Sequence, residues 1–167
     1  MIRVINASPL IYLGKLGILS LLQRLFDQVL TVDAVKEEVL DSSASEYAIL
    51  QGAFEDWLVV SEVPRSPLSG RLSAMGLHQG EIDTLVLAYH TKAEDSDSVV
   101  IIDDLAARDV ARTLGLGVTG TIGVILRATK DGILTKDESL VKIRSLVNET
   151  SFRMSAALYS RIISELE

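Results

Sequence analysis

Short apolar runs alternate with longer amphipathic segments along this chain. The apolar or β-branched runs predict strands at residues 2–5, 28–32, 57–60 and 99–102 and within 115–123. Apolar residues at helical spacing predict helices at residues 10–13, 18–26, 34–40, 46–53, 81–90, 104–114, 124–130, 137–147 and 155–166. Strands that alternate with helices indicate an α/β protein whose sheet is parallel or mostly parallel and covered on both faces.

Residues that favour caps and turns set the expected element boundaries. Ser8 before Pro9 fits a helix N-cap with proline at the first helical position, and Asp33 fits the N-cap of a later helix. Residues 62–70 are the clearest predicted loop. The glycine-rich stretch at 115–123 lacks a phosphate-binding lysine, so we expect a tight turn in which glycine supplies a positive φ.

Length and composition narrow the class of protein. With 167 residues and 48% hydrophobic residues, the chain has the size of one domain with a real core. It contains no cysteine and only two histidines, which excludes disulfides, thiolate metal sites and a histidine-rich zinc centre. The net charge of −7 argues against a surface built for bulk nucleic-acid binding, although nucleic acid can still be a substrate.

The hydrophobic segments are too short for a membrane protein. No stretch approaches the roughly 18 to 20 unbroken apolar residues that a membrane span requires. The first residues form a strand-like run and lack the pattern of a signal peptide. We therefore expect a soluble, cytoplasmic protein with no membrane partner.

Four separate segments bring oxygen-bearing side chains to a strand end or a helix wall. In chain order, these side chains are Asn6, the pair Glu37 and Glu38, the pair Glu81 and Asp83, and the pair Asp103 and Asp104. In parallel sheets the ligand crevice lies beyond the carboxyl ends of the strands, where Asn6 and the Asp103–Asp104 pair are expected. Oxygen donors from distant segments suit a hard divalent cation such as Mg²⁺ or Mn²⁺.

Each of these positions also has an ordinary structural explanation. Asn6 after a strand fits a turn or a helix cap. Either Asp103 or Asp104 is expected to cap the helix that follows. The remaining acids fit a solvated helix surface, as for Glu37 and Glu38, or the first turn of a helix, as for Glu81 and Asp83. The combination of the four segments, rather than any one of them, indicates a site.

In their order and spacing, four motifs together resemble the PIN domain family, prokaryotic metal-dependent ribonucleases that include the VapC-type toxins. These motifs are Val4-Ile5-Asn6-Ala7-Ser8-Pro9-Leu10-Ile11, residues 35–39, residues 80–88 and residues 101–108. The resemblance runs from residue 2 to about residue 130 and looks closest to a little-characterised prokaryotic branch. It implies a three-layer α/β/α fold over residues 1–130, with residues 131–167 as a C-terminal helical extension packed on the same domain.

The resemblance also implies the roles of individual residues. The four acids of the family fall on Asn6, on Glu38 with Glu37 as the alternative register, on Glu81 with Asp83 close by, and on Asp103 or Asp104. These residues would bind one or two Mg²⁺ or Mn²⁺ ions, with Glu38, Glu81, Asp103 and Asp104 as the catalytic acids. The substrate-binding candidates are Ser8, Arg108 and Thr121, of which Thr121 is chosen for its hydroxyl near the strand ends.

The function expected from this resemblance is endonucleolytic cleavage of RNA, with the toxin of a toxin–antitoxin pair as one form of it. The partners would be an RNA substrate, an antitoxin protein and a second copy of the chain in a homodimer. Asn6 stands where the family usually has aspartate. Asparagine keeps an oxygen ligand but lacks the negative charge of aspartate. A PIN-like domain that binds RNA or protein without cutting is therefore the alternative, and a small phosphoryl-transfer or signalling domain is a third hypothesis.

Overall fold

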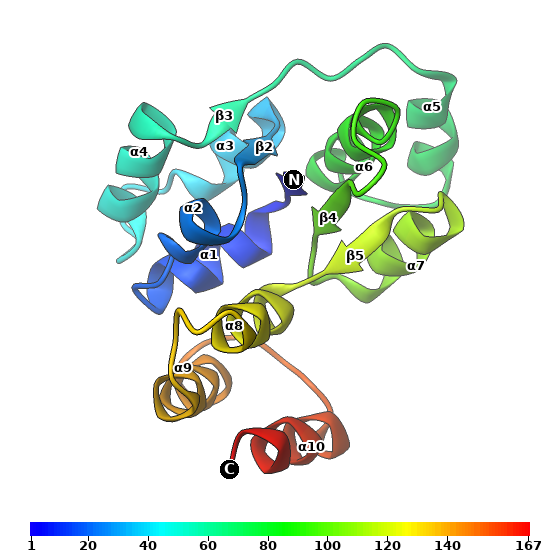
Figure 1. Cartoon of the computed structure of the whole chain (residues 1–167). Helices are drawn as coiled ribbons and strands as arrows, with labels where there is room; N and C mark the ends of the chain where they lie inside the picture. Colours follow the sequence, from blue (N-terminus) through cyan, green and yellow to red (C-terminus); the bar gives the residue numbers. More distant parts are fainter.

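A five-stranded, all-parallel sheet forms the centre of the computed structural model, which describes residues 1–167 (Figure 1). The strands are β1 (Ile2–Ile5), β2 (Gln28–Thr31), β3 (Val59–Val60), β4 (Val99–Ile101) and β5 (Gly117–Thr119). Their order in the sheet is β3-β2-β1-β4-β5. The chain builds outward from β1 to β3 and then returns to β4, so the direction of winding reverses between β1 and β4. A crevice beyond the carboxyl ends of these two strands is where such sheets bind ligands.

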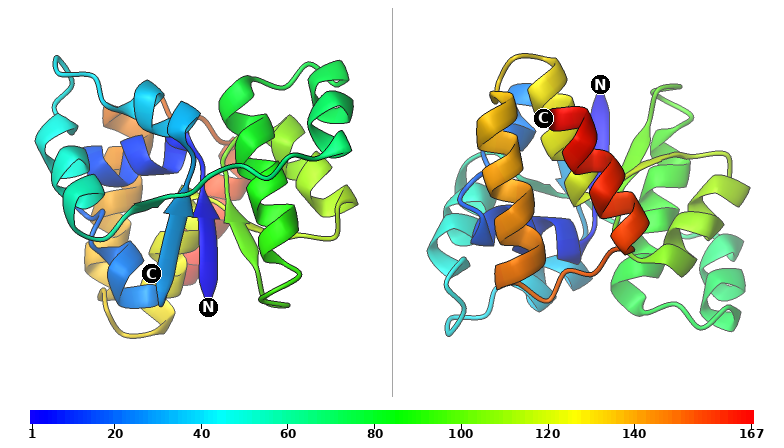
Figure 2. Two further views of the ribbon diagram at one scale, coloured as in Figure 1. Left: turned by 90° about the horizontal axis from the view of Figure 1, so that it is seen from above. Right: turned by 90° about the horizontal axis from the view of Figure 1, so that it is seen from below.

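Helices cover both faces of the sheet (Figures 1 and 2). Helices α1, α2 and α8 pack against one another on one face, and α6 and α7 pack against β1, β4 and β5 on the other. The helix bounds are α1 (Ala7–Lys15), α2 (Leu21–Leu25), α3 (Asp33–Val39), α4 (Tyr47–Asp56), α5 (Pro67–Ala74), α6 (Gln79–Thr91), α7 (Leu105–Thr113), α8 (Thr121–Lys130), α9 (Lys136–Glu149) and α10 (Ala156–Leu166). The three-layer α/β/α architecture predicted from the sequence is confirmed. No helix has the length and apolar character needed to cross a membrane.

The two C-terminal helices share the core of the sheet domain. Helix α9 begins with a reciprocal capping box, in which Glu138 N–H donates to Thr135 Oγ1 at 3.1 Å and Thr135 N–H donates to Glu138 Oε2 at 2.7 Å. Helix α9 packs on α8, and α10 packs on α9. Their inward residues Leu140, Ile143, Leu146, Ile162 and Leu166 belong to the same continuous hydrophobic core as the strands. The division of the chain at residue 130 stays a prediction.

Replacing Ile143 with alanine should destabilise the whole domain. Ile143 is fully buried, and its truncation leaves a cavity where α9 meets the rest of the core. We expect the free energy of unfolding to fall by about 2–5 kcal/mol, in a single transition followed by circular dichroism in urea. Val141→Ala is the matched control, because Val141 lies on the same helix at 59% exposure and should change stability by less than about 0.5 kcal/mol. A separate early transition in Ile143→Ala, with the main transition unmoved, would contradict a shared core.

Helix α1 begins earlier than the sequence suggests. Its N-cap is Asn6, which has extended backbone angles, and Ala7 is already helical. The predicted N-cap at Ser8 is therefore wrong. Pro9 occupies the third helical position, where it is tolerated because the first four N–H groups of a helix have no partner within the helix. Asp33 is likewise the first residue of α3 rather than its cap, which is Val32.

Part of the predicted loop at residues 62–70 is helical. Helix α5 starts at Pro67, and its N-cap Ser66 accepts a hydrogen bond from Leu68 N–H at 3.2 Å. Ser66 followed by proline is the start signal that the sequence analysis applied to Ser8 and Pro9. The signal therefore identifies a helix start at Ser66 but not at Ser8.

Candidate functional site

A cavity of about 540 Å³ opens beyond the carboxyl end of β1. The start of α1, one side of α3 and the start of α6 form its wall. The lining residues are Asn6, Ala7, Ser8, Ala34, Glu37, Glu38, His78, Gln79, Gly80 and Glu81. Three of the four oxygen-bearing segments found in the sequence thus meet at one place, which lies at the winding reversal of the sheet.

Gly80 brings the oxygens of Asn6 and Glu38 together. A Cβ atom at Gly80 would lie 3.5 Å from Glu38 Oε2 and 3.8 Å from Asn6 Oδ1, so both oxygens lie against the glycine backbone. Glu37 also lines the cavity, but its oxygens are not near Gly80. Of the two registers left open by the sequence, the geometry favours Glu38.

Thr84 positions the Asn6 carboxamide, which is only 6% exposed. The Asn6 backbone N–H donates to Ile101 O at 3.0 Å and extends the pairing of β1 with β4. The Thr84 hydroxyl has a single proton, which it donates to Gly80 O at 2.6 Å, so its 3.4 Å contact with Asn6 Oδ1 is secondary.

Sequence reasoning did not assign Gly80, Thr84 or His78 to the site. The signal for Gly80 is its place directly before Glu81, at the start of the helix that carries the acid. Thr84 lies one helical turn after Gly80, on the side of α6 that faces β1. His78 lines the cavity as the N-cap residue of α6.

The acids on α6 are held by the helix itself. Glu81 Oε2 accepts a hydrogen bond from His78 N–H at 3.0 Å, an arrangement that the helix dipole favours. Its other carboxylate oxygen makes no hydrogen bond. Asp83 does not line the cavity, and its Oδ1 accepts from Gln79 Nε2 at 2.7 Å. Glu81 is therefore the acid of this pair that reaches the cavity.

The two aspartates after β4 cap different helices. Asp104 Oδ1 accepts from Ala107 N–H at 2.8 Å and caps α7, as expected for one member of the pair. Asp103 accepts from Thr121 N–H at 2.8 Å and from Thr121 Oγ1 at 2.7 Å, which places its charge at the start of α8. Neither aspartate lines the cavity, and neither does Thr121.

Glycine at position 120 makes room for this capping interaction. A Cβ there would lie 2.5 Å from Asp103 Oδ1 and 2.9 Å from Arg108 Nη1, too close for any side chain. Gly120 has a negative φ, and within the glycine-rich stretch only Gly115 has a positive φ, of 72°. The expected positive φ is therefore absent from the turn between β5 and α8, where close approach is the reason for Gly120, and it occurs only at Gly115, between α7 and β5.

Arg108 supports the Asp103 segment rather than the cavity. Its Nη1 donates to Ile102 O at 2.9 Å. Burial lowers the pKa of the Arg108 guanidinium, and it raises the pKa of the Asp103 carboxyl. The hydrogen bonds from Thr121 and the charge of Arg108 act against the rise at Asp103. Of the three substrate-binding candidates, only Ser8 lines the cavity.

Replacing Asp103 with asparagine should change how stability depends on pH. Because the pKa of Asp103 is raised above its ordinary value of 3.8, the folded protein binds this proton more readily than the unfolded chain. The contribution of Asp103 to stability is therefore present at low pH and is lost as pH rises through the folded-state pKa. In EDTA, the difference in free energy of unfolding between Asp103→Asn and wild type should shift in favour of the variant as pH rises above 3.8. A difference that is constant with pH would contradict the raised pKa.

The donors around the cavity suit a hard divalent cation. Nowhere in the chain do three or more histidine or acidic side chains converge closely enough to hold a metal ion. Mg²⁺ is commonly held by only one or two carboxylates and keeps several waters. Asn6 and Glu38, whose side-chain oxygens both lie near Gly80, and Glu81 on the same wall meet that smaller requirement with oxygen donors alone.

Comparison with known proteins identifies one family. Residues 2–167 match the family described as PIN domain, which is nearly the whole chain. No curated protein matches the chain. The match extends beyond the stretch to about residue 130 that carried the resemblance in the sequence.

Proposed function

Because the chain belongs to the PIN domain family, whose members are generally nucleases and typically use divalent metal ions, we propose that it is a metal-dependent endoribonuclease. The observation that carries this proposal is the approach of Asn6 Oδ1 and Glu38 Oε2 to the backbone of Gly80, inside the cavity at the winding reversal of the sheet. The proposed substrate is RNA and the proposed reaction is hydrolysis of its phosphodiester bonds.

Electrostatics explain why the reaction would need a cation. Glu37, Glu38 and Glu81 give the cavity three carboxylates in a chain of net charge −7, and a phosphodiester would be repelled from it. Mg²⁺ or Mn²⁺ bound at this cavity supplies charge neutralisation and activation of water. Cleavage should therefore be absent without a divalent ion.

The cavity residues have distinct proposed roles. Asn6 and Glu38 would provide the first two oxygen ligands, and the free carboxylate oxygen of Glu81 the third. The Glu38 carboxylate makes no hydrogen bond to the protein and can accept a proton from the attacking water. The Ser8 hydroxyl, on the same wall, can donate a hydrogen bond to a phosphate oxygen.

The remaining residues of the family pattern would act from the end of β4. Asp103 and Asp104 remain proposed as acidic residues of the site, but both carboxylates are engaged at helix starts. Their contribution would require those hydrogen bonds to be exchanged. Arg108 would keep the Asp103 segment in place through its bond to the Ile102 carbonyl.

A toxin of a toxin–antitoxin pair is the proposed biological form of this activity. The proposed protein partners are an antitoxin, which would lay a segment across the acidic cavity, and a second copy of the chain. A cytoplasmic location follows from an RNA substrate inside the cell. A neighbouring gene for a small DNA-binding protein with an extended tail would support this part of the proposal.

The second candidate function is binding of RNA or protein without cleavage. It is favoured by Asn6, which supplies an oxygen but no charge, and by the lack of three convergent acids. Such a protein would retain the fold and the cavity and would bind metal only weakly.

A metal-titrated cleavage assay separates the two functions. End-labelled single-stranded RNA and single-stranded DNA of the same sequence are incubated with the protein and increasing Mn²⁺ or Mg²⁺. We expect RNA fragments that increase with metal and disappear with EDTA, and little cleavage of the DNA. RNA that is bound but not cut with either metal would favour the second function.

A further inference from the structure

We propose that a second cavity, between β5 and α8, binds a small organic phosphate monoester. This cavity has a volume of about 330 Å³ and shares no lining residue with the acidic cavity. Its lining residues are Arg3, Phe26, Val99, Gly117, Val118, Thr119, Gly123, Val124 and Arg127. The proposal does not depend on the proposed nuclease function.

The sheet register places three lining residues of this cavity in one row. Arg3 on β1 pairs with Val99 on β4, which pairs with Gly117 on β5, so the three residues form one row on the same face of the sheet. Gly117 ends this row without a side chain. A Cβ there would lie 2.7 Å from Val99 Cγ2, so position 117 has no room for a larger residue. Val99 thus occupies the place that a side chain at 117 would need, and both residues line the cavity together with Arg3.

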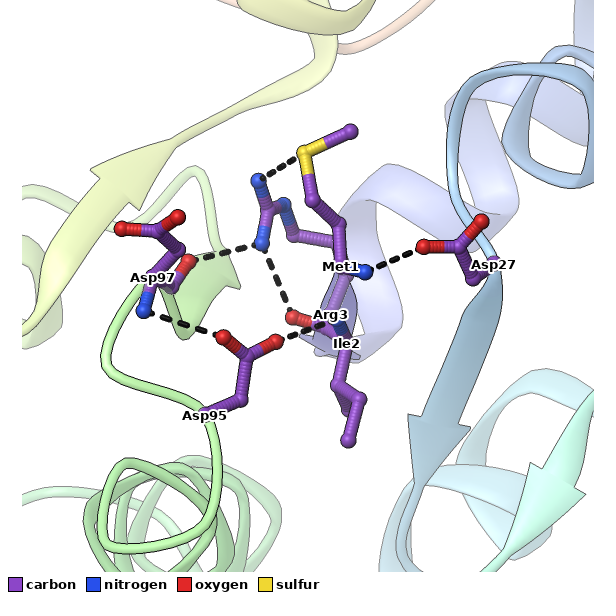
Figure 3. Close-up of polar contacts among 6 residues, drawn as sticks. All are labelled: Met1, Ile2, Arg3, Asp27, Asp95 and Asp97. Atoms are coloured by element: carbon purple, nitrogen blue, oxygen red, sulfur yellow. Dashed lines mark hydrogen bonds and ion pairs between the residues drawn. The ribbon is translucent and has the colours of Figure 1, made fainter.

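Arg3 is a buried charge that no carboxylate contacts directly. Arg3 is only 6% exposed, and its guanidinium carbon lies 5.0 Å from the centre of the Phe26 ring. Nη1 donates to Ile2 O at 2.9 Å and to Asp97 O at 2.8 Å, and Nη2 contacts Met1 Sδ at 3.2 Å (Figure 3).

The aspartates near Arg3 do not pair with it. Asp97 contacts Arg3 through its backbone carbonyl, while its carboxylate points away (Figure 3). Asp95 accepts from Ile2 N–H at 2.9 Å and from Asp97 N–H at 3.0 Å, and Asp27 contacts the Met1 amino group. No acidic side chain forms an ion pair with Arg3. Buried charges in proteins are normally paired, whereas the carboxylates of Asp95, Asp97 and Asp27 act on Arg3 through their charge without direct contact.

Arg127 adds a second guanidinium to the same cavity. Its Nε donates to Asp131 Oδ2 at 2.7 Å, and its two Nη atoms make no hydrogen bond to the protein. Burial lowers the pKa of Arg3, the charge of Asp95 acts against this, and the charge of Arg127 lowers the pKa again. Two guanidiniums that repel each other across one cavity would both be stabilised by an anion bound between them.

The shape and chemistry of the cavity select the ligand class. A tetrahedral phosphate dianion can accept hydrogen bonds from two guanidiniums on different elements. The volume exceeds that of a phosphate group, and Val99, Val118 and Val124 provide an apolar wall for an organic body. The net charge of −7 opposes a long polyanion, which favours a small molecule over a nucleic-acid strand.

The structural alternative is that Arg3 only ties β1 to the segment before β4 through Asp97 O. That role accounts for two hydrogen bonds but not for the second arginine or for the cavity. It predicts no ligand and no effect of Arg127. The experiment therefore rests on Arg127, whose side chain is 46% exposed and can be replaced with little risk to folding.

The test uses adenosine 5′-monophosphate as the probe and follows backbone amide shifts by NMR. We expect saturable shifts of the Gly117 and Gly123 amides with this nucleotide, weaker binding of inorganic phosphate, and none with uncharged adenosine. Arg127→Gln should weaken binding about tenfold or more, since it removes one of two charged hydrogen-bond donors. Arg112→Gln is the matched control, because Arg112 is also half-exposed and paired with a nearby aspartate on its own helix.

Three results would overturn the proposal. The first is no amide shift at millimolar nucleotide. The second is equal binding by Arg127→Gln and wild type. The third is equal affinity for inorganic phosphate and the nucleotide, which would show that the organic part of the ligand contributes nothing to binding. None of these results bears on RNA cleavage, so this proposal and the nuclease proposal fail independently.

Discussion

Replacing Glu38 with glutamine is expected to reduce metal-dependent RNA cleavage by about 100-fold or more. The substitution keeps the shape of the side chain and removes a carboxylate that lies beside Asn6 and Gly80. Because Asn6 is uncharged, Glu38 supplies most of the local attraction for Mg²⁺ or Mn²⁺. Loss of a ligand also misplaces the ion relative to the substrate, and errors of about 1 Å in such geometry cost about 100-fold. Initial rates over a range of Mn²⁺ concentrations measure the effect.

Glu37→Gln is the matched control for this prediction. Glu37 is the neighbouring residue on α3 and lines the same cavity, but its oxygens do not approach Gly80. We expect Glu37→Gln to reduce the cleavage rate by less than about tenfold, because it only weakens the negative electrostatic field that attracts the cation. Equal losses in the two variants, or a greater loss in Glu37→Gln, would show that the register was assigned incorrectly.

Replacing Asn6 with aspartate should make stability depend on metal. Asn6 is 6% exposed, and a carboxylate there would be a buried charge in a cavity that no lysine or arginine lines. In EDTA we expect the free energy of unfolding to fall by about 1–3 kcal/mol. With Mn²⁺ bound, the added carboxylate should increase metal affinity about tenfold or more, which corresponds to about 1.4 kcal/mol.

Thermal unfolding of wild type and Asn6→Asp, each in EDTA and in saturating Mn²⁺, measures both effects. The cleavage assay on the same variant then separates the two candidate functions. Cleavage by wild type that rises further in Asn6→Asp supports a working nuclease. Cleavage that appears only in the variant would identify a binding domain that has lost its metal. A variant equally stable with and without metal would contradict a cation site at Asn6.

The fold was largely predictable because short apolar runs mark the strands, whereas apolar residues at helical spacing mark the helices. The run at residues 2–5 and the run at residues 99–102 read as buried strands, and both form the centre of the sheet. The ends of the helices were less predictable, because the same serine–proline pair marks a helix start at one position and not at another. Ser8-Pro9 and Ser66-Pro67 have the same start pattern, yet only Ser66 caps a helix. At Ser8 the chain has already turned helical at Ala7, a consequence of where β1 ends.

The acidic residues show which part of a site the sequence can predict. The resemblance to the PIN domain family placed Asn6, Glu38 and Glu81 in one site, and these three residues line one cavity beyond the end of β1. The side-chain partners could not be predicted in the same way. Asp103 bonds to Thr121, eighteen residues away and on the helix after β5, and that contact requires the close approach at Gly120. Nothing local to Asp103 in the sequence indicates it.

Direct measurement of Mn²⁺ binding tests the central claim, that the cavity beside Gly80 is the divalent metal site. The loss of the free-Mn²⁺ electron paramagnetic resonance signal is followed for wild type and for the double variant Glu38→Gln, Glu81→Gln. We predict saturable binding by wild type that the double variant loses, while both proteins keep the same circular dichroism spectrum. Identical Mn²⁺ binding by the two folded proteins would contradict the account and place any metal elsewhere in the molecule.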